Sequence, residues 1–416
     1  MNATQSASVI VVSHGRPAEL RRCLTAIAQL DHPEFEVIVV ADASGRAALA
    51  DLGVAGYVKA VPFERANISQ ARNLGIEVAA GEIAAFIDDD AVPEPSWLSY
   101  LTAPFTDDRV AAAGGYVRGR NGITLQHRAS WVDSLAHSHP LEVDETVTTL
   151  HQSVPGAAVK TEGTCMAFRR TLLARMGGFD PCYRFYLDET DLNLRLAQDE
   201  QITAVVPAAQ VLHGVAASSR RRGDRVPTDL GEIGASSAVF LRKHAPEGTP
   251  IKARLAAMER EQRRRLLGHM VTGRLEPRDV GRLLEGFAEG IAAGLRREIA
   301  PLHPIGAPKA PFLRFPESGP RAGRVLAGWI WQGRRMRRTA RAQVGDGAVV
   351  TVLRLSPSTF YHHVRFHPDG YWLQTGGLWG RSDRDQPLIR PYRFVARMRA
   401  EIARIAPFRP VDTLLG

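Results

Sequence analysis

Three consecutive carboxylates follow an apolar segment, and they are the residues best suited to chemistry. Asp88, Asp89 and Asp90 come directly after residues 83–87, whose Phe and two Ile are typical of a strand buried on both faces. We therefore expect them at the carboxyl edge of that strand, where open α/β sheets bind ligands. Carboxylates this close repel one another unless a cation or donor lies among them, so they predict a site for Mg²⁺ or Mn²⁺. The alternative is an acidic turn before a helix that starts near Ser96.

A fourth acid, Asp42, lies at the end of another predicted strand. Residues 8–13 and 35–40 are β-branched runs, and residues 16–30 between them carry apolar side chains at helical spacing, which predicts a parallel βαβ unit. An acid after the second strand can accept a hydrogen bond from a ribose hydroxyl or a base N–H, although an Asx turn is also common there. No GxGxxG sequence accompanies these strands, which excludes a Rossmann dehydrogenase.

Two further groups of polar residues lie at predicted helix starts. Arg72 and Asn73 come early in a helix predicted over residues 66–80, where a guanidinium and the positive helix end both suit a diphosphate. Asp188 and Glu189 begin a helix within residues 187–196, where acids serve either as caps or as catalytic groups.

Together these segments resemble the nucleotide-binding half of the family 2 glycosyltransferases, which have the GT-A fold. The similarity is carried by residues 8–27, 35–44 and 71–98. The resemblance implies that Asp42 contacts the nucleobase or ribose of a nucleotide-sugar donor. It also implies that Asp88 and Asp90 form the Asp-x-Asp motif, which holds the metal that bridges the donor diphosphate, with Asp89 between them.

The resemblance continues into the acceptor-side part of the family, where a Gly-rich strand lines the sugar pocket. Residues 162–170 and 177–186 are similar to this part. The donor-binding residues that the resemblance implies are Asp42, Arg72, Asp88, Asp89, Gly163 and Thr164.

The resemblance also suggests the base and a third metal ligand. The family places an acidic pair before x-Asp-Leu-x-x-Arg, and the second acid of that pair is the general base. Here the pair is Asp188-Glu189 instead of Glu-Asp, so the resemblance implies Glu189 as the base and Asp188 as an orienting group, with the reverse assignment left open. His213 alone is typical of a structural residue, but it follows a strand where such enzymes carry a metal-binding histidine. The implied metal ligands are therefore Asp88, Asp90 and His213.

The implied function is metal-dependent inverting transfer of one sugar from a nucleotide-sugar donor to an acceptor hydroxyl. The acceptor is expected to be a glycan or a lipid-linked compound, in cell-surface polysaccharide or glycan assembly. One alternative is a sugar-1-phosphate nucleotidyltransferase. Such an enzyme needs a Gly-rich cationic loop after the first strand, and residues 13–17 resemble that loop only weakly. The other is a non-catalytic binding or scaffold protein with a GT-A-like domain.

Length and composition predict several regions. The chain has 416 residues, and 44% of them are hydrophobic. A chain of this length is longer than one ordinary domain, so we expect more than one domain. We expect an α/β protein with a GT-A type open sheet of nucleotide-binding βαβ units in residues 1–247, then a helical segment in 248–301. A Pro- and Gly-rich linker in 302–323 and a small C-terminal α/β region of unknown role in 324–416 complete the prediction.

Charge and cysteine content bear on partners and compartment. The net charge is +9, but no nucleic-acid motif accompanies it, so we expect no nucleic-acid partner. The basic residues 260–265 leave open a peripheral contact with an anionic membrane surface. Three cysteines without CxxC spacing, no signal peptide and no apolar run of about 18 residues predict a cytoplasmic protein, with a peripheral position at the inner face of the membrane left open.

Overall fold

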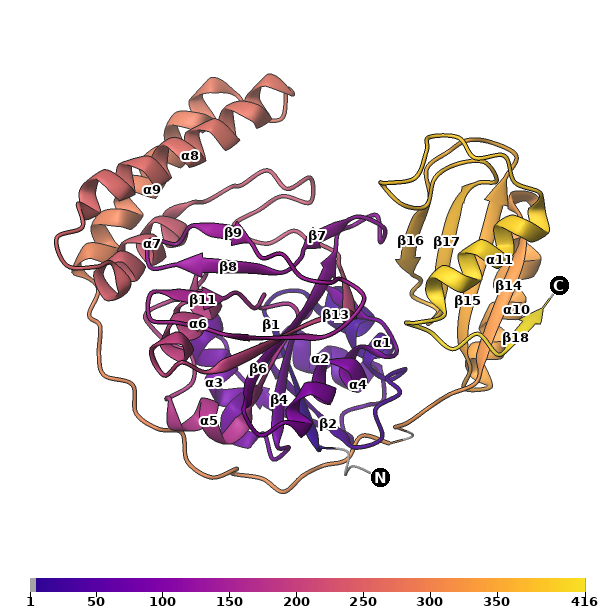
Figure 1. Cartoon of the computed structure of the whole chain (residues 1–416), viewed down its shortest axis with the longest axis horizontal. Coiled ribbons are helices and arrows are strands. Elements are labelled where there is room, and N and C mark those ends of the chain that lie inside the picture. The colour runs from indigo at the N-terminus through magenta and orange to yellow at the C-terminus, as the bar shows by residue number, and fades with distance from the viewer. Residues whose placement is uncertain (1–4, 317, 416) are drawn as a thin grey trace.

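A computed structural model describes residues 5–316 and 318–415 of the chain. Figure 1 shows a large N-terminal α/β domain, a pair of long helices beside it, an extended segment along its lower edge and a smaller C-terminal α/β domain. This mixed α/β architecture confirms the predicted fold class.

The N-terminal domain is built on one open, mixed sheet, whose first four strands in chain order pair in parallel. Its strands are β1 (Ala7–Ser13), β2 (Phe35–Ala41), β3 (Val58–Pro62), β4 (Ile83–Asp88), β5 (Ala91–Pro93), β6 (Val110–Arg118), β7 (Leu125–His127), β10 (Thr149–Gln152), β12 (Met166–Arg169) and β13 (Ile202–His213). The order is β10-β13-β6-β12-β4-β1-β2-β3, with β5 beside β13 and β7 beside β6. β1 pairs in parallel with β2 and β4, as the predicted βαβ unit requires. β12 is antiparallel to both neighbours.

Helices cover both faces of this sheet, because its central strands are apolar on both sides. The helices of the domain are α1 (Pro17–Ile27), α2 (Ala43–Asp51), α3 (Ile68–Val78), α4 (Trp97–Thr102), η1 (Ala103–Thr106), α5 (Arg170–Arg175), α6 (Asp188–Gln198) and α7 (Gly231–His244). Leu24 and Trp97 belong to the core on one face, and Ile76, Phe86 and Leu192 to the core on the other. Because the helices cover the two faces, the carboxyl edge of the sheet remains uncovered.

A helical pair extends the N-terminal domain. A small sheet of β8 (Ser130–Asp133), β9 (Ser138–Pro140) and β11 (Ala157–Val159) shares a core with α7, α8 (Ile251–Val271) and α9 (Pro277–Arg296). A Cβ atom at Gly290 would lie only 1.9 Å from the carbonyl oxygen of Gly231, so glycine permits close approach of α9 to α7. Among the helices that the structure describes, none combines the length and apolarity needed to span a membrane.

The C-terminal domain follows an extended segment whose Phe315 stacks on Phe35 with ring centroids 5.4 Å apart. Its elements are β14 (Gly323–Trp329), η2 (Ile330–Gln332), α10 (Gly333–Gly345), β15 (Val349–Ser356), β16 (His363–Phe366), β17 (Trp372–Gly377), α11 (Phe394–Ile405) and β18 (Thr413–Leu415). The sheet order is β16-β17-β15-β14-β18, and only the edge strand β16 is antiparallel to its neighbour among the described strands. Val364 and Trp372 share a core with Val92 and Leu212 of the N-terminal domain, so the two domains are packed together.

Candidate active site

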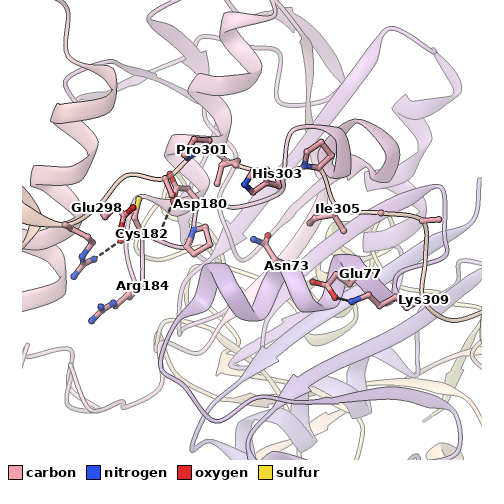
Figure 2. A pocket seen from close by; sticks show the side chains of 18 residues that line it. Asn73, Glu77, Asp180, Cys182, Arg184, Glu298, Pro301, His303, Ile305 and Lys309 are labelled. Carbon is pink, nitrogen blue, oxygen red and sulfur yellow. Dashed lines mark hydrogen bonds and ion pairs between the residues drawn. The ribbon is translucent and has the colours of Figure 1, made fainter.

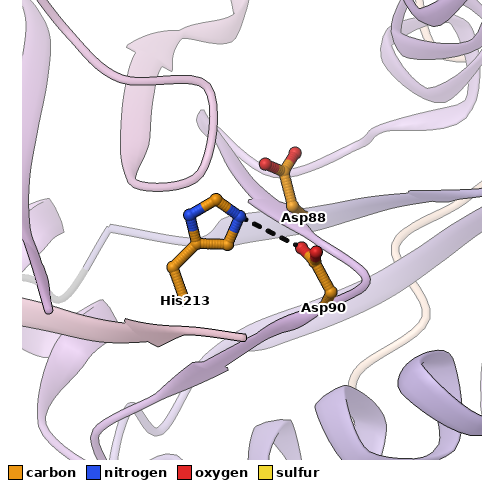
Figure 3. A group of neighbouring side chains, drawn as sticks. All are labelled: Asp88, Asp90 and His213. Atoms are coloured by element: carbon orange, nitrogen blue, oxygen red, sulfur yellow. Dashed lines mark ion pairs between the residues drawn. The ribbon is translucent and has the colours of Figure 1, made fainter. Parts of the chain in front are cut away.

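Asp88, Asp90 and His213 form one group at the carboxyl edge of the large sheet (Figure 3). Asp88 ends β4, and Asp90 lies in the turn before β5. β5 pairs with β13 so that Ala91 lies opposite His213, which brings the histidine to the acidic turn from far along the chain. One ligand atom from each of the three side chains lies within 4.8 Å of the others. The three residues predicted as metal ligands therefore lie close enough together to share an ion.

The chemistry of this group fits a divalent cation. Asp90 is buried, and its Oδ1 lies 3.3 Å from His213 Nε2. Burial opposes ionisation of Asp90, but the hydrogen bond and charge of His213, together with Arg16, outweigh it and lower the pKa of Asp90. Asp90 is thus held ionised, as a metal ligand must be. Two carboxylates and one imidazole are the donor types found around Mn²⁺ and related divalent ions.

Asp89 has different surroundings from its two neighbours. Its side chain is fully buried, and its Oδ1 lies 2.5 Å from a terminal nitrogen of Arg16. Burial raises the pKa of Asp89 to about 7 against the opposing charge of Arg16. Arg16 also reaches Asp90 Oδ2 at 3.3 Å. Asp89 therefore anchors Arg16 beside the metal group, and the structure does not place it among the potential ligands.

Arg72 connects the metal group to the predicted catalytic acids. It lies in α3, is buried, and pairs through one terminal nitrogen with Asp188. Its other terminal nitrogen donates to the carbonyl oxygen of Gly163 at 3.2 Å and lies 3.5 Å from Asp88 Oδ1. The hydroxyl of Thr164 donates to the other oxygen of Asp88. Four of the predicted donor-site residues, Arg72, Asp88, Gly163 and Thr164, are thus in one hydrogen-bonded unit.

The two acids at the start of α6 differ in their surroundings. Asp188 is buried and paired with Arg72. The carboxylate of Glu189 is half-buried, and it has no hydrogen-bond or ion-pair partner among the residues that the structure describes. Burial, then the charge of Asp188, raises the pKa of Glu189 to about 8. An unpaired carboxyl group with a raised pKa is suited to accept a proton from a substrate.

A cavity of 560 Å³ opens beside the metal group. Asp88 and Arg16 line one side of it, and residues 63–68 and 217–221 line others. Several cationic side chains face this space, contributed by separate segments: Arg16, Arg65, Arg184, Arg220, Arg221 and Arg265. Such a cavity suits a ligand with several negative charges.

Asp42 lies just behind this cavity and does not line it. Its Oδ2 accepts a hydrogen bond from the backbone N–H of Gly15 at 2.7 Å, and its Oδ1 accepts from the N–H of Gly45 at 2.9 Å. It thereby caps α2 and fixes residues 14–16, which do line the cavity.

A second cavity, of 720 Å³, lies between α3, residues 177–184 and the extended segment 298–309 (Figure 2). Several of its charged groups already have partners, since Glu77 pairs with Lys309 and Arg297 donates to the carbonyl of Cys182 at 2.7 Å. None of the metal group or the acidic pair lines it. We therefore do not assign this cavity to the active site.

Sequence reasoning missed Arg16 and Arg265 as site residues. Arg16 follows β1 in the segment SHGRP and pairs with Asp89 and Asp90, more than 70 positions away, so no local pattern indicated its role. Arg265 belongs to the basic run in α8, which the sequence assigned only to a membrane or to solvent.

The N-terminal part of the chain matches a known protein family. Residues 8–177 match the family described as Glycosyl transferase family 2, which confirms the resemblance inferred from the sequence over that range. The region after residue 177 lies outside the match.

Relatives and solved structures are similar to parts of the chain. The O-antigen biosynthesis protein RfbC of Myxococcus xanthus is 28% identical over 263 residues, covering 60% of this chain and 20% of that protein. The N-acetylglucosaminyl-diphospho-decaprenol L-rhamnosyltransferase of Mycobacterium tuberculosis is 39% identical over 59 residues, 14% of this chain and 19% of that protein. The chain thus spans about a fifth of the length of either relative. The mannosyltransferase PcManGT from Pyrobaculum calidifontis, solved with GDP-Man and Mn²⁺, has 18% identity and a TM-score of 0.43, covering 71% of this chain and 89% of that one.

Proposed function

We propose, on the premise that residues 8–177 match glycosyl transferase family 2, that this chain is a metal-dependent glycosyltransferase. It would transfer one sugar, with inversion, from a nucleotide-sugar donor to an acceptor hydroxyl. The observation that carries the proposal is the joint placement of two groups. Asp88, Asp90 and His213 gather beside a cationic cavity, and an unpaired Glu189 stands next to the Asp188–Arg72 pair that reaches Asp88.

The cavity and the metal group together suit the diphosphate of the donor. Arg16, Arg220 and Arg221 supply positive charge around it. Asp88, Asp90 and His213 would hold the ion, and the mixed oxygen and nitrogen donor set favours Mn²⁺ over Mg²⁺. When bound, the ion offsets negative charge on the departing nucleoside diphosphate.

Glu189 is proposed to act as the general base toward the acceptor hydroxyl. The carboxylate would accept the hydroxyl proton while the acceptor oxygen forms its bond to the sugar. Asp188 is paired with Arg72, so it is less free to accept a proton. It instead holds Arg72, and with it the start of α6, close to Asp88.

We assign the acceptor to glycans or lipid-linked glycans of polysaccharide assembly, as the names of the relatives suggest. A cytoplasmic location, with peripheral contact of residues 260–265 at an anionic membrane, belongs to the same proposal.

Thermal-shift measurements with UDP-, GDP- and dTDP-sugars, each with and without Mn²⁺, test the donor site. A ligand that binds only the folded state raises the melting temperature by mass action. We expect one donor class to stabilise the protein, and to do so only when Mn²⁺ is present. Asp90→Asn should abolish that Mn²⁺-dependent shift. Asp385→Asn, which changes an exposed carboxylate of the C-terminal domain, is the matched control and should keep it.

Transfer itself is read from release of the nucleoside diphosphate in the presence of the stabilising donor. Persistence of the Mn²⁺-dependent shift in Asp90→Asn would contradict the proposed metal site. Absence of any shift in the wild-type protein with every donor would contradict the proposed function.

A further inference from the structure

The C-terminal domain carries a cleft of its own at the carboxyl edge of its sheet. β14, β15 and β17 run in parallel and end together, and their register places Gly328, Arg354 and Thr375 side by side. Two cavities of 430 Å³ and 470 Å³ open at this edge and share Ile330 and Arg354 in their walls. We call this combined space the C-terminal cleft. In open α/β sheets the carboxyl edge is where ligands bind.

Arg354, at the centre of the cleft, lies on the face of the C-terminal sheet that is turned away from the packed domain interface. Side chains alternate between the faces of a strand, and Val350 and Val352 belong to the core beneath α10. Arg354 follows them on this same face. Val349, on the other face, belongs to the core shared with the N-terminal domain. The cleft is therefore separate from the active site described above.

The cleft is lined by several arginines and, among the described residues, by no acidic side chain. Arg334, Arg337 and Arg354 line it, and its described lining contains no Asp or Glu. Arg354 has no hydrogen-bond or ion-pair partner in the part of the chain that the structure describes, and its Nε is buried and unsatisfied. Arg354 as a whole is partly buried, and the desolvation of its unsatisfied Nε carries a cost that an anion in the cleft would offset.

The start of α10 adds to the positive potential. This helix of 13 residues begins at Gly333, has no acidic residue in its first turn and has no side-chain cap. A Cβ at Gly333 would lie 3.2 Å from a terminal nitrogen of Arg354, so glycine lets the guanidinium lie against the first turn. The N–H of Gly333 already donates to the carbonyl oxygen of Ile330, so it is the dipole of α10 that favours an anion at the same place as Arg354.

Large apolar side chains surround this cationic centre. Trp331 is 66% exposed, Ile330 52% and Phe360 73%. Exposed side chains of this size on both sides of a charged cleft are typical of a binding surface and not of solvated surface. The ring of Trp331 is also stacked on Trp329, with centroids 5.2 Å apart, which holds it at the rim.

We propose that the C-terminal cleft binds a phosphate or diphosphate group through Arg354 and Arg334, beside the positive end of the α10 dipole, with the apolar rim in contact with the rest of the ligand. Arginine suits this role because its guanidinium can donate two hydrogen bonds to one phosphate. The same chemistry could come from a soluble phosphate compound or from the headgroup of an anionic lipid. This inference does not depend on the proposed transferase function.

Two binding assays on the full chain distinguish these sources. The first is calorimetric titration with inorganic pyrophosphate in EDTA, and the second is cosedimentation with vesicles of phosphatidylglycerol, with phosphatidylcholine vesicles as the neutral control. Arg354→Gln and Arg334→Gln should each weaken binding by about 10- to 100-fold, the loss expected for one charge-assisted hydrogen bond. Arg338→Gln, an exposed arginine of α10 that does not line the cleft, should have no effect.

The outcomes separate clearly. Arg354-dependent binding of pyrophosphate alone supports the site and assigns it to a soluble ligand. Arg354-dependent binding of phosphatidylglycerol vesicles supports the site and assigns it to lipid. Binding of neither probe by the wild-type protein, or equal binding by the wild type and both cleft variants, overturns the proposal. Unchanged circular dichroism spectra and melting temperatures show that the variants are folded.

Discussion

Arg409, just after the last helix, donates two hydrogen bonds to Glu94, which lies four positions after the metal-group residue Asp90. Its Nε lies 2.5 Å from Glu94 Oε2 and one terminal nitrogen lies 2.7 Å from Oε1. Both side chains are 3% exposed, and the guanidinium carbon of Arg409 lies 3.7 Å from the ring centroid of Trp372. The C-terminal domain is thus joined by a buried ion pair to the residue that directly follows β5.

This pair predicts a large stability effect for Arg409→Ala. Removing one member of a buried pair leaves an uncompensated charge and costs about 3–5 kcal/mol. The measurement is urea unfolding followed by circular dichroism. Arg399→Ala, an exposed arginine of α11, is the matched control and should change stability by less than about 0.5 kcal/mol. A loss below about 1 kcal/mol for Arg409→Ala would show that Glu94 finds water or another partner.

The different surroundings of Glu189 and Asp188 predict different kinetic effects. Glu189→Gln is nearly isosteric and removes the proposed base, so kcat should fall by about 10²–10⁴-fold with donor affinity almost unchanged. Asp188→Asn weakens the pair with Arg72 and should raise KM more than it lowers kcat. Steady-state kinetics with the donor found by thermal shift is the measurement. The reverse pattern would assign the base to Asp188.

The raised pKa of Glu189 predicts a pH dependence. A general base must be deprotonated to act, and burial raises the pKa of Glu189 to about 8. kcat/KM should therefore fall about tenfold for each pH unit below 8 and level off above it. Glu189→Gln should lose this acidic limb along with most of the activity, because glutamine does not titrate. An acidic limb centred near pH 4.5 would mean that Glu189 is ionised in the free enzyme at neutral pH and that its raised pKa is irrelevant to the rate.

Parts of the fold and the site followed from local sequence patterns. Ile83–Asp88 is the strand that its apolar run predicts, and the helical segment predicted in residues 248–301 contains α8 and α9. Asp88 and Asp90 are placed together by one turn, so spacing alone located them. The strand predicted before His213 is β13, whose pairing with β6 shifts register between Val206 and Gln210.

Other features depend on contacts between distant segments. His213 reaches the acidic turn only because β13 pairs with β5. Arg16 and Arg409 have partners 73 and 315 positions away, respectively. The burial and the charge environment of such residues depend on tertiary packing, so they cannot be predicted from the neighbouring residues in the sequence. The C-terminal cleft likewise arises from the register of three parallel strands, whereas the sequence indicated only a small α/β region of unknown role.

The packing of α9 on α7 predicts where the chain can be shortened. The sequence assigns residues 1–247 to one domain, but Phe287 and Leu283 of α9 belong to the same core as Val239 and Leu241 of α7. Losing even a few buried side chains of this size costs about 2–5 kcal/mol each, which approaches the whole stability of a domain of about 5–15 kcal/mol.

We therefore expect a protein ending at residue 247 to aggregate or to lack cooperative melting. A protein ending at residue 316 keeps α8, α9 and the stack of Phe315 on Phe35, so it should melt cooperatively and retain Mn²⁺-dependent donor binding. Thermal unfolding by circular dichroism and size-exclusion chromatography of both proteins make the comparison. Because Glu94 becomes exposed when the C-terminal domain is absent, the loss of Arg409 should not by itself unfold the longer protein. If the 1–247 protein instead melts cooperatively within a few degrees of the 1–316 protein, α8 and α9 form a separate unit and the domain boundary lies at residue 247.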